Sequence, residues 1–282
     1  MKVLVTGSAG RLGSAVMAKL RSSKIEAIGA DLISGPTTDL VLDIRDAVEV
    51  VKACQNMDAI IHTAALHGKH YDLDYSREQF IHTNVYGTLN LLNAAVKCGV
   101  KKLLYISTTS IYGNAMVDAA QAVWVDELLS EQPRDIYDIT KQTAEQLCKD
   151  FFYKEQLETS VYRVGRFLPE AANLQANHRL YRGLDPRDGA EALYLALQQN
   201  FTDFEIFNIA SSSPFTRDDL KTLKSNPVEI IQQMYPDAVA IYEAKQWQLP
   251  NSIDRVYVTD KANRLLSYSP KFTFDYLLRN KC

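Results

Sequence analysis

The sequence has few of the features that mark disulfide-bonded or membrane-inserted proteins. Its four cysteines, Cys54, Cys98, Cys148 and Cys282, lie far apart and form no CxxC pair, which favours reduced thiols in a cytoplasmic protein. No apolar run approaches the roughly 20 residues that a membrane-spanning helix needs. The first residues are typical of a strand and not of a basic leader with an apolar segment. We therefore expect a cytoplasmic protein with no membrane partner.

The sequence also lacks a strong excess of charge of either sign. The formal net charge is −3, from 31 Lys and Arg against 34 Asp and Glu, and no basic stripe or long like-charge run is present. Binding to nucleic acid is therefore disfavoured, and a small molecule is the expected partner. A length of 282 residues allows one large core or a core with a smaller lobe.

Short apolar runs alternate with stretches of helical period over the first 165 residues. This alternation predicts a parallel sheet covered by helices, an α/β fold of the Rossmann-type, doubly wound class. The predicted strands cover 2–6, 25–30, 59–65, 101–107 and 159–164. The predicted helices lie near 11–22, 46–55, 77–98 and 137–156.

The pattern loosens after Arg163. A helix near 187–200 and a strand near 204–209 continue the sheet, and a polar tail with prolines carries helical pieces near 217–234 and 259–266. We expect residues 1–164 plus 187–210 to form the sheet domain. Residues 165–186 plus 211–282 are expected to form a small C-terminal lobe that binds the substrate.

Three glycines, Gly7, Gly10 and Gly13, lie where the first predicted strand ends and a helix begins. Such a loop can hold a pyrophosphate on backbone N–H groups at the positive end of the helix. The GxxGxxG spacing differs from the common GxGxxG fingerprint, so a simple turn is the alternative. Asp31 ends the second predicted strand, where a carboxylate can accept hydrogen bonds from an adenosine ribose. That carboxylate would repel a 2′-phosphate, and this favours NAD over NADP.

A second group of polar residues is the stretch YDITK, which places Tyr137 and Lys141 one helical turn apart. A neighbouring ammonium stabilises a phenolate, so the pair can move a proton to or from a hydroxyl. Residues 107–110, STTS, supply hydroxyl groups at the carboxyl edge of the predicted sheet, where ligands bind in open α/β sheets. A solvated Tyr/Lys helix face is the alternative for YDITK alone.

Taken together, these motifs resemble the extended short-chain dehydrogenase/reductases, also called the NAD-dependent epimerase/dehydratase family. The resemblance rests on segments in the family's order: TGSAGRLG (6–13), Asp31, DIRD (43–46), HTAA (62–65), NVYGTLNLL (84–92), STTSIYG (107–113), YDITK (137–141), RDGAEALYLAL (187–197) and VTDKANRLLSYSPKF (258–272). It implies hydride transfer between a carbinol carbon and NAD. It also implies a homodimer through the helices near 77–98 and 137–156.

The resemblance assigns roles residue by residue. It implies that Tyr137 is the general acid/base, that Lys141 tunes it and holds the nicotinamide ribose, and that Thr108 binds the reacting oxygen. The implied cofactor-binding residues are Gly7, Ala9, Gly10, Arg11, Leu12, Gly13, Asp31, Asp43, Ile44, Thr63, Ala64, Ala65, Asn84, Ile106, Tyr137 and Lys141. Among these, Asp43 and Ile44 match positions at the adenine, and Asn84 matches a residue that braces the groove.

Two departures from the family's pattern narrow the expected chemistry. Thr109 and Ser110 stand where dehydratases of the family commonly carry Asp-Glu, which disfavours dehydration. The stretch from Arg163 to Asp188 is short, with little room for a nucleotide, which favours a small sugar, sugar acid or polyol-like substrate. The predicted substrate-binding residues are Thr108, Thr109, His67 and Arg166. Arg163, Arg166, Arg179 and Arg182 are candidates for binding a carboxylate or phosphate, with surface or interlobe ion pairs as the alternative.

The histidines leave further alternatives. His67 or His70 as a second acid/base would enable epimerisation, although a solvated loop also accounts for both. His62, His67 and His70 lack a carboxylate at ligand spacing, so no metal is predicted. We expect an NAD-dependent oxidoreductase, with a sugar or nucleotide-sugar epimerase as the first alternative and an NAD-sensing, non-catalytic regulator as the second.

Overall fold

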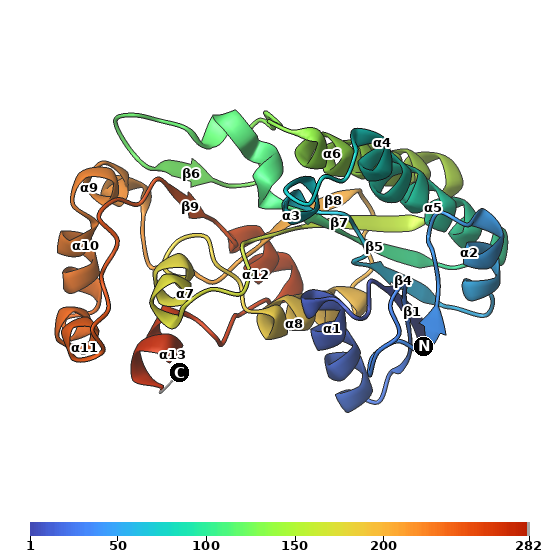
Figure 1. Cartoon of the computed structure of the whole chain (residues 1–282), viewed down its shortest axis with the longest axis horizontal. Coiled ribbons are helices and arrows are strands. Elements are labelled where there is room, and N and C mark those ends of the chain that lie inside the picture. Colours follow the sequence, from blue (N-terminus) through green and yellow to red (C-terminus); the bar gives the residue numbers. More distant parts are fainter. Residues whose placement is uncertain (281–282) are drawn as a thin grey trace.

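A parallel sheet organises the chain (Figure 1). The computed structural model describes residues 1–280, without the side chains of Lys69 and Tyr71. Within these residues seven strands form the sheet, in the order β3 (Leu40–Val41), β2 (Glu26–Asp31), β1 (Lys2–Thr6), β4 (Ala59–His62), β5 (Lys102–Thr108), β7 (Glu158–Val164) and β8 (Glu205–Ile209). Every pairing is parallel. This confirms the predicted fold class, and the reversal of strand order between β1 and β4 opens a crevice at their carboxyl ends.

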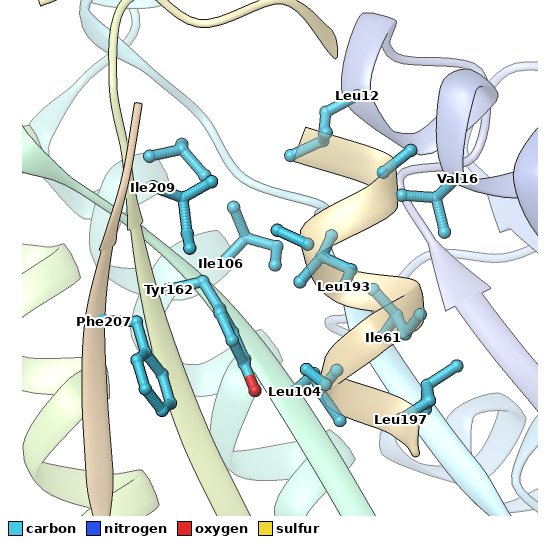
Figure 2. Close-up of a cluster of buried hydrophobic side chains, with 14 of the residues drawn as sticks. Leu12, Val16, Ile61, Leu104, Ile106, Tyr162, Leu193, Leu197, Phe207 and Ile209 are labelled. Carbon is cyan, nitrogen blue, oxygen red and sulfur yellow. The ribbon is translucent and has the colours of Figure 1, made fainter. Parts of the chain in front are cut away.

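Helices cover both faces of the sheet. One face carries α1 (Arg11–Ser22), α8 (Pro186–Leu197) and α12 (Asp260–Leu266), and the other carries α2 (Ala47–Ala53), α5 (Gly87–Cys98) and α6 (Ile136–Glu155). Figure 2 shows Leu193 and Leu197 of α8 packed among side chains from the strands, such as Leu104. Because both faces are buried, the strands are continuous apolar runs and not alternating ones.

The predicted helix over 77–98 is present but interrupted. It consists of α4 (Arg77–Phe80), a π-helical segment, η1 (Ile81–Tyr86), and α5. The wider turn holds Asn84, whose side-chain oxygen accepts a hydrogen bond from the Leu66 backbone N–H at 2.8 Å, while its nitrogen donates to the Leu66 carbonyl at 2.9 Å. A π-helical turn in mid-helix often marks a functional position, and this one fixes the loop after β4.

A small lobe lies at one end of the sheet (Figure 1). Its helices are α7 (Ala172–Arg179), α9 (Leu220–Ser225), α10 (Pro227–Met234), α11 (Ala238–Ala244) and α13 (Phe274–Arg279), and its two parallel strands are β6 (Val123–Val125) and β9 (Arg255–Tyr257). The helical region expected near 217–234 comprises η3 (Arg217–Asp219), α9 and α10, and Pro227 begins the last of these after Asn226. These elements share one apolar core.

Two segments tie the lobe to the sheet domain. Strand β6 belongs to the part of the chain expected in the sheet domain, yet it pairs with β9 of the lobe. Conversely, Ala262 and Leu266 of α12 are buried in the core beside the sheet, although the expected boundary places them in the lobe. The remaining short elements, α3 (Gly68–Tyr71) and the 3-10 segment η2 (Thr109–Met116), follow β4 and β5.

Reduced cysteines and the lack of a membrane-spanning segment were expected from the sequence. Cys54, Cys98 and Cys148 are free thiols, and Cys282 lies outside the described residues. Within residues 1–280, none of the helices combines the length and the apolar character needed to cross a bilayer.

Candidate functional site

The glycine loop joins β1 to α1 in a conformation that needs its glycines. Gly7 has φ of +74°, a region that favours glycine, and a Cβ there would lie 2.6 Å from the Ala64 nitrogen. A Cβ on Gly13 would lie 2.1 Å from the Gly7 carbonyl oxygen. Helix α1 begins after Gly10 with no side-chain cap and no acidic residue in its first turn. Its first N–H groups are therefore left for an anion, which fits the pyrophosphate of a dinucleotide.

Asp31 at the end of β2 meets the same loop. One carboxylate oxygen accepts a hydrogen bond from the Ala9 N–H at 2.9 Å, and the other accepts from the Ile33 N–H at 3.1 Å. The carboxylate is half-buried and keeps lone pairs for a ribose hydroxyl. Asp43 is held by Arg45 at 2.6 Å, and that guanidinium lowers the pKa of the Asp43 carboxyl.

One cleft collects nearly all of the predicted site residues. It encloses about 1380 Å³ at the carboxyl edge of the sheet. The predicted residues that line it are Gly7, Ala9, Gly10, Arg11, Leu12, Gly13, Asp31, Asp43, Ile44, Thr63, Ala64, Ala65, His67, Ile106, Thr108, Thr109, Tyr137, Lys141 and Arg166. Asn84 does not line it but holds Leu66, which does. The parallel topology explains this meeting, since the carboxyl ends of parallel strands share one edge.

Tyr137, Thr108 and Lys141 line the same cleft. Burial raises the pKa of the Tyr137 phenol, as do the charges of Asp138 and Asp135, and the Thr108 hydroxyl opposes this shift. The phenol is thus a proton donor at neutral pH in the chain without a bound ligand. The arrangement can give a proton to, or take one from, a hydroxyl group placed beside it.

Lys141 is buried, with 3% of its surface exposed. Its amine donates a hydrogen bond to the Ile106 carbonyl and lies 4.2 Å from the centre of the Tyr105 ring. Burial lowers the pKa of Lys141 to about 7, although the charge of Glu145 opposes this shift. The amine therefore lies close to the balance between its charged and neutral forms.

Sequence reasoning did not identify a second polar pair next to Tyr137. The Ser110 hydroxyl donates a hydrogen bond of 2.5 Å to Asp138, and it lies 3.0 Å from the Thr108 hydroxyl. Both residues line the cleft, and Asp138 is 1% exposed. The sequence does show Asp138, as the residue after Tyr137 in YDITK. A carboxylate in the first turn of a helix is, however, already explained by the helix dipole.

Four arginines were candidates for binding an acidic group, and the structure separates them. For Arg163 the expectation is wrong, because the guanidinium is buried against Glu131 and Glu145 and does not line the cleft. The expectation is also wrong for Arg179, which forms an ion pair with Asp185 at 3.0 Å. Arg179 does not line the main cleft. Arg166 and Arg182 do line the cleft.

Arg166 and Arg182 are joined through two other side chains. Arg166 pairs with Glu170 at 2.6 Å, Glu170 accepts from His178 at 2.7 Å, and Arg182 donates to the other His178 nitrogen at 2.8 Å. Within the described part of the chain, Arg182 has no carboxylate at ion-pair distance. Arg134 and Arg255 also line the cleft, and sequence reasoning missed both. Arg255 reaches it only because β9 pairs with β6.

The other predicted substrate residues differ in what they offer. Thr109 lines the cleft but is buried, and its hydroxyl donates to the Val164 carbonyl at 3.3 Å. His67 lines the cleft with its ring 4.4 Å from that of His70. His62 instead lies in the core between the hydroxyls of Thr6 and Thr88, and burial lowers its pKa to about 3. Across residues 1–280, no three His, Cys, Asp or Glu side chains gather as a metal site would require.

A family model and several curated proteins match this chain. The model of the NAD dependent epimerase/dehydratase family matches residues 3–180. A uronate dehydrogenase of Pseudomonas putida is 25% identical over 180 residues, which cover 62% of this chain and 64% of that protein. The matches span between 33% and 64% of the length of the first three curated relatives.

Solved structures share the fold. A short-chain dehydrogenase/reductase superfamily protein from Agrobacterium tumefaciens, with bound NAD, gives a TM-score of 0.74 at 19% identity and covers 99% of this chain and 95% of that one. UDP-glucose 4-epimerase from Thermotoga maritima, with UDP-glucose, gives a TM-score of 0.73 at 21% identity, with coverage of 99% and 96%. At these identities the likeness concerns the fold alone.

Proposed function

The chain belongs to the NAD dependent epimerase/dehydratase family of enzymes, and on this premise we propose that it is an oxidoreductase for a small sugar, sugar acid or polyol. The family assignment confirms the resemblance drawn from the sequence, and NAD is the cofactor that defines the family. The observation that carries the proposal is the meeting of Tyr137, Thr108 and Lys141 beside the glycine loop in one cleft. Bound NAD supplies the acceptor or donor of hydride at a carbinol carbon.

The protein's own residues divide the remaining work. The loop of Gly7, Gly10 and Gly13 holds the pyrophosphate on backbone N–H groups, and Asp31 accepts from the adenosine ribose. Thr108 orients the reacting oxygen, and Tyr137 exchanges a proton with it. Lys141, one helical turn after Tyr137, supplies an amine to the same cleft, and burial lowers the pKa of that amine to about 7.

A sugar acid is the substrate class that the lobe side of the cleft supports best. Arg182 lines the cleft without a carboxylate partner among residues 1–280, and Arg166 lies in the same hydrogen-bonded chain. Guanidinium groups bind carboxylates with two parallel hydrogen bonds. The likeness to a uronate dehydrogenase over 62% of this chain points to the same class.

The test is to follow NADH absorbance while offering uronic acids, neutral sugars and polyols to the purified protein with NAD. We expect NADH to appear with at least one uronic acid. An Arg182→Met variant should raise KM for that acid at least tenfold through the lost ion pair, while the KM of a neutral substrate stays the same. Absence of NADH with every compound of the panel would refute the oxidoreductase proposal.

Epimerisation is the second candidate function. The observation that favours it is His67, which lines the same cleft and supplies a second group for proton exchange. In that case a sugar is inverted at one carbon with no net NADH, because the cofactor is restored in each turnover. Product analysis by NMR after incubation with catalytic NAD separates the two reactions.

We also propose a homodimer through the two helices that the family resemblance indicates. Apolar side chains are exposed on this side of the chain, among them Ile81, Tyr86 and Ile139. Light scattering at micromolar concentration should give twice the chain mass, and Ile139→Glu should reduce it to one. A wild-type monomer would contradict the assembly.

A further inference from the structure

The pair Ser110 and Asp138 has no task in the function proposed so far. Asp138 follows Tyr137 in the first turn of α6, and Ser110 lies in η2 just after β5. One Asp138 oxygen accepts from the Ser110 hydroxyl at 2.5 Å, and the other accepts from the Arg134 backbone N–H at 3.2 Å. The Ser110 hydroxyl lies 3.0 Å from the Thr108 hydroxyl, and Thr108 in turn acts on the Tyr137 phenol and lowers its pKa. Four side chains thus form a continuous path from the phenol to a buried carboxylate.

The direction of these hydrogen bonds follows from the number of protons. An ionised carboxylate only accepts, so the one proton of Ser110 points to Asp138. Between Ser110 and Thr108 the donor must then be Thr108. With its proton committed, the Thr108 oxygen accepts from the Ser110 backbone N–H at 3.1 Å, and its remaining lone pair is left for the Tyr137 hydroxyl. All donors therefore point from Tyr137 toward Asp138.

We propose that Asp138 is a positioning residue that stores the proton released during oxidation, with Thr108 and Ser110 as the path from Tyr137. This inference rests on the proposed function. Oxidation of a carbinol releases one proton from its hydroxyl group as the C–H bond breaks. That proton passes to the Tyr137 oxygen, the Tyr137 proton passes to Thr108, the Thr108 proton to Ser110, and the Ser110 proton to Asp138. One carboxylate becomes one carboxylic acid, and the three hydroxyl groups are restored with their donors reversed.

The surroundings of Asp138 suit a group that takes up a proton. Burial and the nearby Asp135 raise the pKa of the Asp138 carboxyl, and the Ser110 hydrogen bond and Arg134 oppose this shift. Tyr137 lies beside it in the same helix. The charge of Asp138 in turn acts on Tyr137 and raises the pKa of the phenol, so the two groups are coupled in both directions. After protonation, the reversed donors would let Thr108 donate to the Tyr137 oxygen while Tyr137 donates to a substrate oxygen in the reduction direction.

Asp138 could instead have a purely structural role at the start of α6, and a control variant distinguishes the two roles. A carboxylate in the first turn of a helix is favourable near the positive end of the dipole whether or not it carries protons for a reaction. Asp135 provides the matched control, because it caps the same helix and accepts from the Asp138 N–H at 2.9 Å, whereas the Ser110 hydroxyl donates to Asp138. Asp135→Asn removes the same charge from the same turn while leaving the hydroxyl path intact.

The first experiment compares Asp138→Asn, Ser110→Ala and Asp135→Asn with the wild type, using D-glucuronate and NAD. We expect Asp138→Asn and Ser110→Ala to lower kcat by about 10- to 100-fold, less than loss of a direct acid or base, with unchanged NAD affinity by fluorescence. The acid limb of the kcat–pH profile should disappear in Asp138→Asn, and the solvent deuterium isotope effect should rise in both variants. Asp135→Asn should keep the acid limb but move it to lower pH, because loss of the Asp135 charge lowers the pKa of Asp138. Equal losses in Asp135→Asn, or an unchanged pH profile in Asp138→Asn, would overturn the proposal.

The second experiment needs no substrate. The ¹³C-labelled tyrosine signal of Tyr137, assigned by its loss in Tyr137→Phe, is followed by NMR from acid to alkaline pH. We expect a shift at the titration of Asp138 in the wild type and Asp135→Asn, and none in Asp138→Asn. Its absence in the wild type would overturn the path. If the path is seen but glucuronate and the other panel compounds give no NADH, the proposed function fails and the coupling of these side chains stands.

Discussion

Lys141 in α6 and Arg163 in β7 are both buried basic side chains, and they differ in what surrounds them. Arg163 is 1% exposed, pairs with Glu145 at 2.7 Å and also with Glu131, and lies 4.9 Å from the centre of the Tyr112 ring. Lys141 is 3% exposed and donates to a neutral carbonyl. Within the described residues it has no carboxylate at ion-pair distance. Burial lowers the pKa of Lys141 to about 7, whereas the two carboxylates raise the pKa of Arg163.

Arg163 is a paired cation that stabilises the fold. Lys141 has a pKa near neutral pH, so its charge can change under ordinary conditions. A buried charge with partners costs much less than an isolated one, so its protonation state is fixed. A buried amine without an ion pair responds to whatever binds next to it. Lys141 lies at the cleft and Arg163 does not. This comparison predicts that changes around Lys141 affect turnover and that changes around Arg163 affect stability.

The largest effect is expected on the Lys141 side, from Tyr137→Phe. Loss of a group that exchanges a proton with the substrate should lower kcat by about 10²- to 10⁴-fold. NAD affinity and the free energy of unfolding should stay close to those of the wild type, because the ring is kept. Steady-state kinetics, cofactor titration and urea unfolding measure the three quantities. Retained turnover would refute the role of Tyr137.

On the Arg163 side, Glu145→Ala should mainly destabilise the fold. Removing one partner of a buried ion pair leaves an uncompensated charge, which costs about 3–5 kcal/mol. Urea unfolding measures the loss. Glu131→Ala is the matched variant, and its cost should be smaller because the Glu131 side chain is 21% exposed. A loss below about 1 kcal/mol for Glu145→Ala would show that the comparison is wrong.

The smallest effect concerns the pH dependence of stability. The pKa of Lys141 is about 7 in the folded chain, against 10.5 for an unperturbed lysine, so between these values the unfolded chain binds more protons at this residue. Lys141 therefore makes the free energy of unfolding rise with pH above about 7, by on the order of 1 kcal/mol per pH unit at most. Urea unfolding at pH 7 and pH 9 should show a smaller rise in Lys141→Met than in the wild type. Equal slopes in both proteins would contradict the shift.

Sequence reasoning worked where one segment carries its own signal. The glycine loop, Asp31 and the pair Tyr137 and Lys141 lie on elements whose period and ends could be identified from the sequence. It worked less well for elements that form only by pairing or packing with a segment far along the chain. The short strand β3, the strands β6 and β9, and helix α7 gave no periodic pattern, because two to eight residues are too few for one.

Residue type alone did not distinguish between the arginines. Arg163 and Arg166 lie three residues apart, yet one is buried against two carboxylates and the other lines the cleft. The two side chains point in different directions because β7 ends at Val164, between them, and because Arg166 forms an isolated β-bridge with Gly183. Glu145, which neutralises Arg163, is a helical residue with no sequence feature of its own that marks it as buried.

The sequence by itself determined the class of fold, the glycine loop with its acidic partner and the proton-exchanging pair, because local backbone geometry and helical spacing specify each of them. Only the tertiary structure decided which charges are neutralised and which face the cleft. The path from Tyr137 through Thr108 and Ser110 to Asp138 likewise exists because β5 and α6 bring their ends together. Hydrogen-bond direction and burial are properties of that meeting, and no single segment contains them.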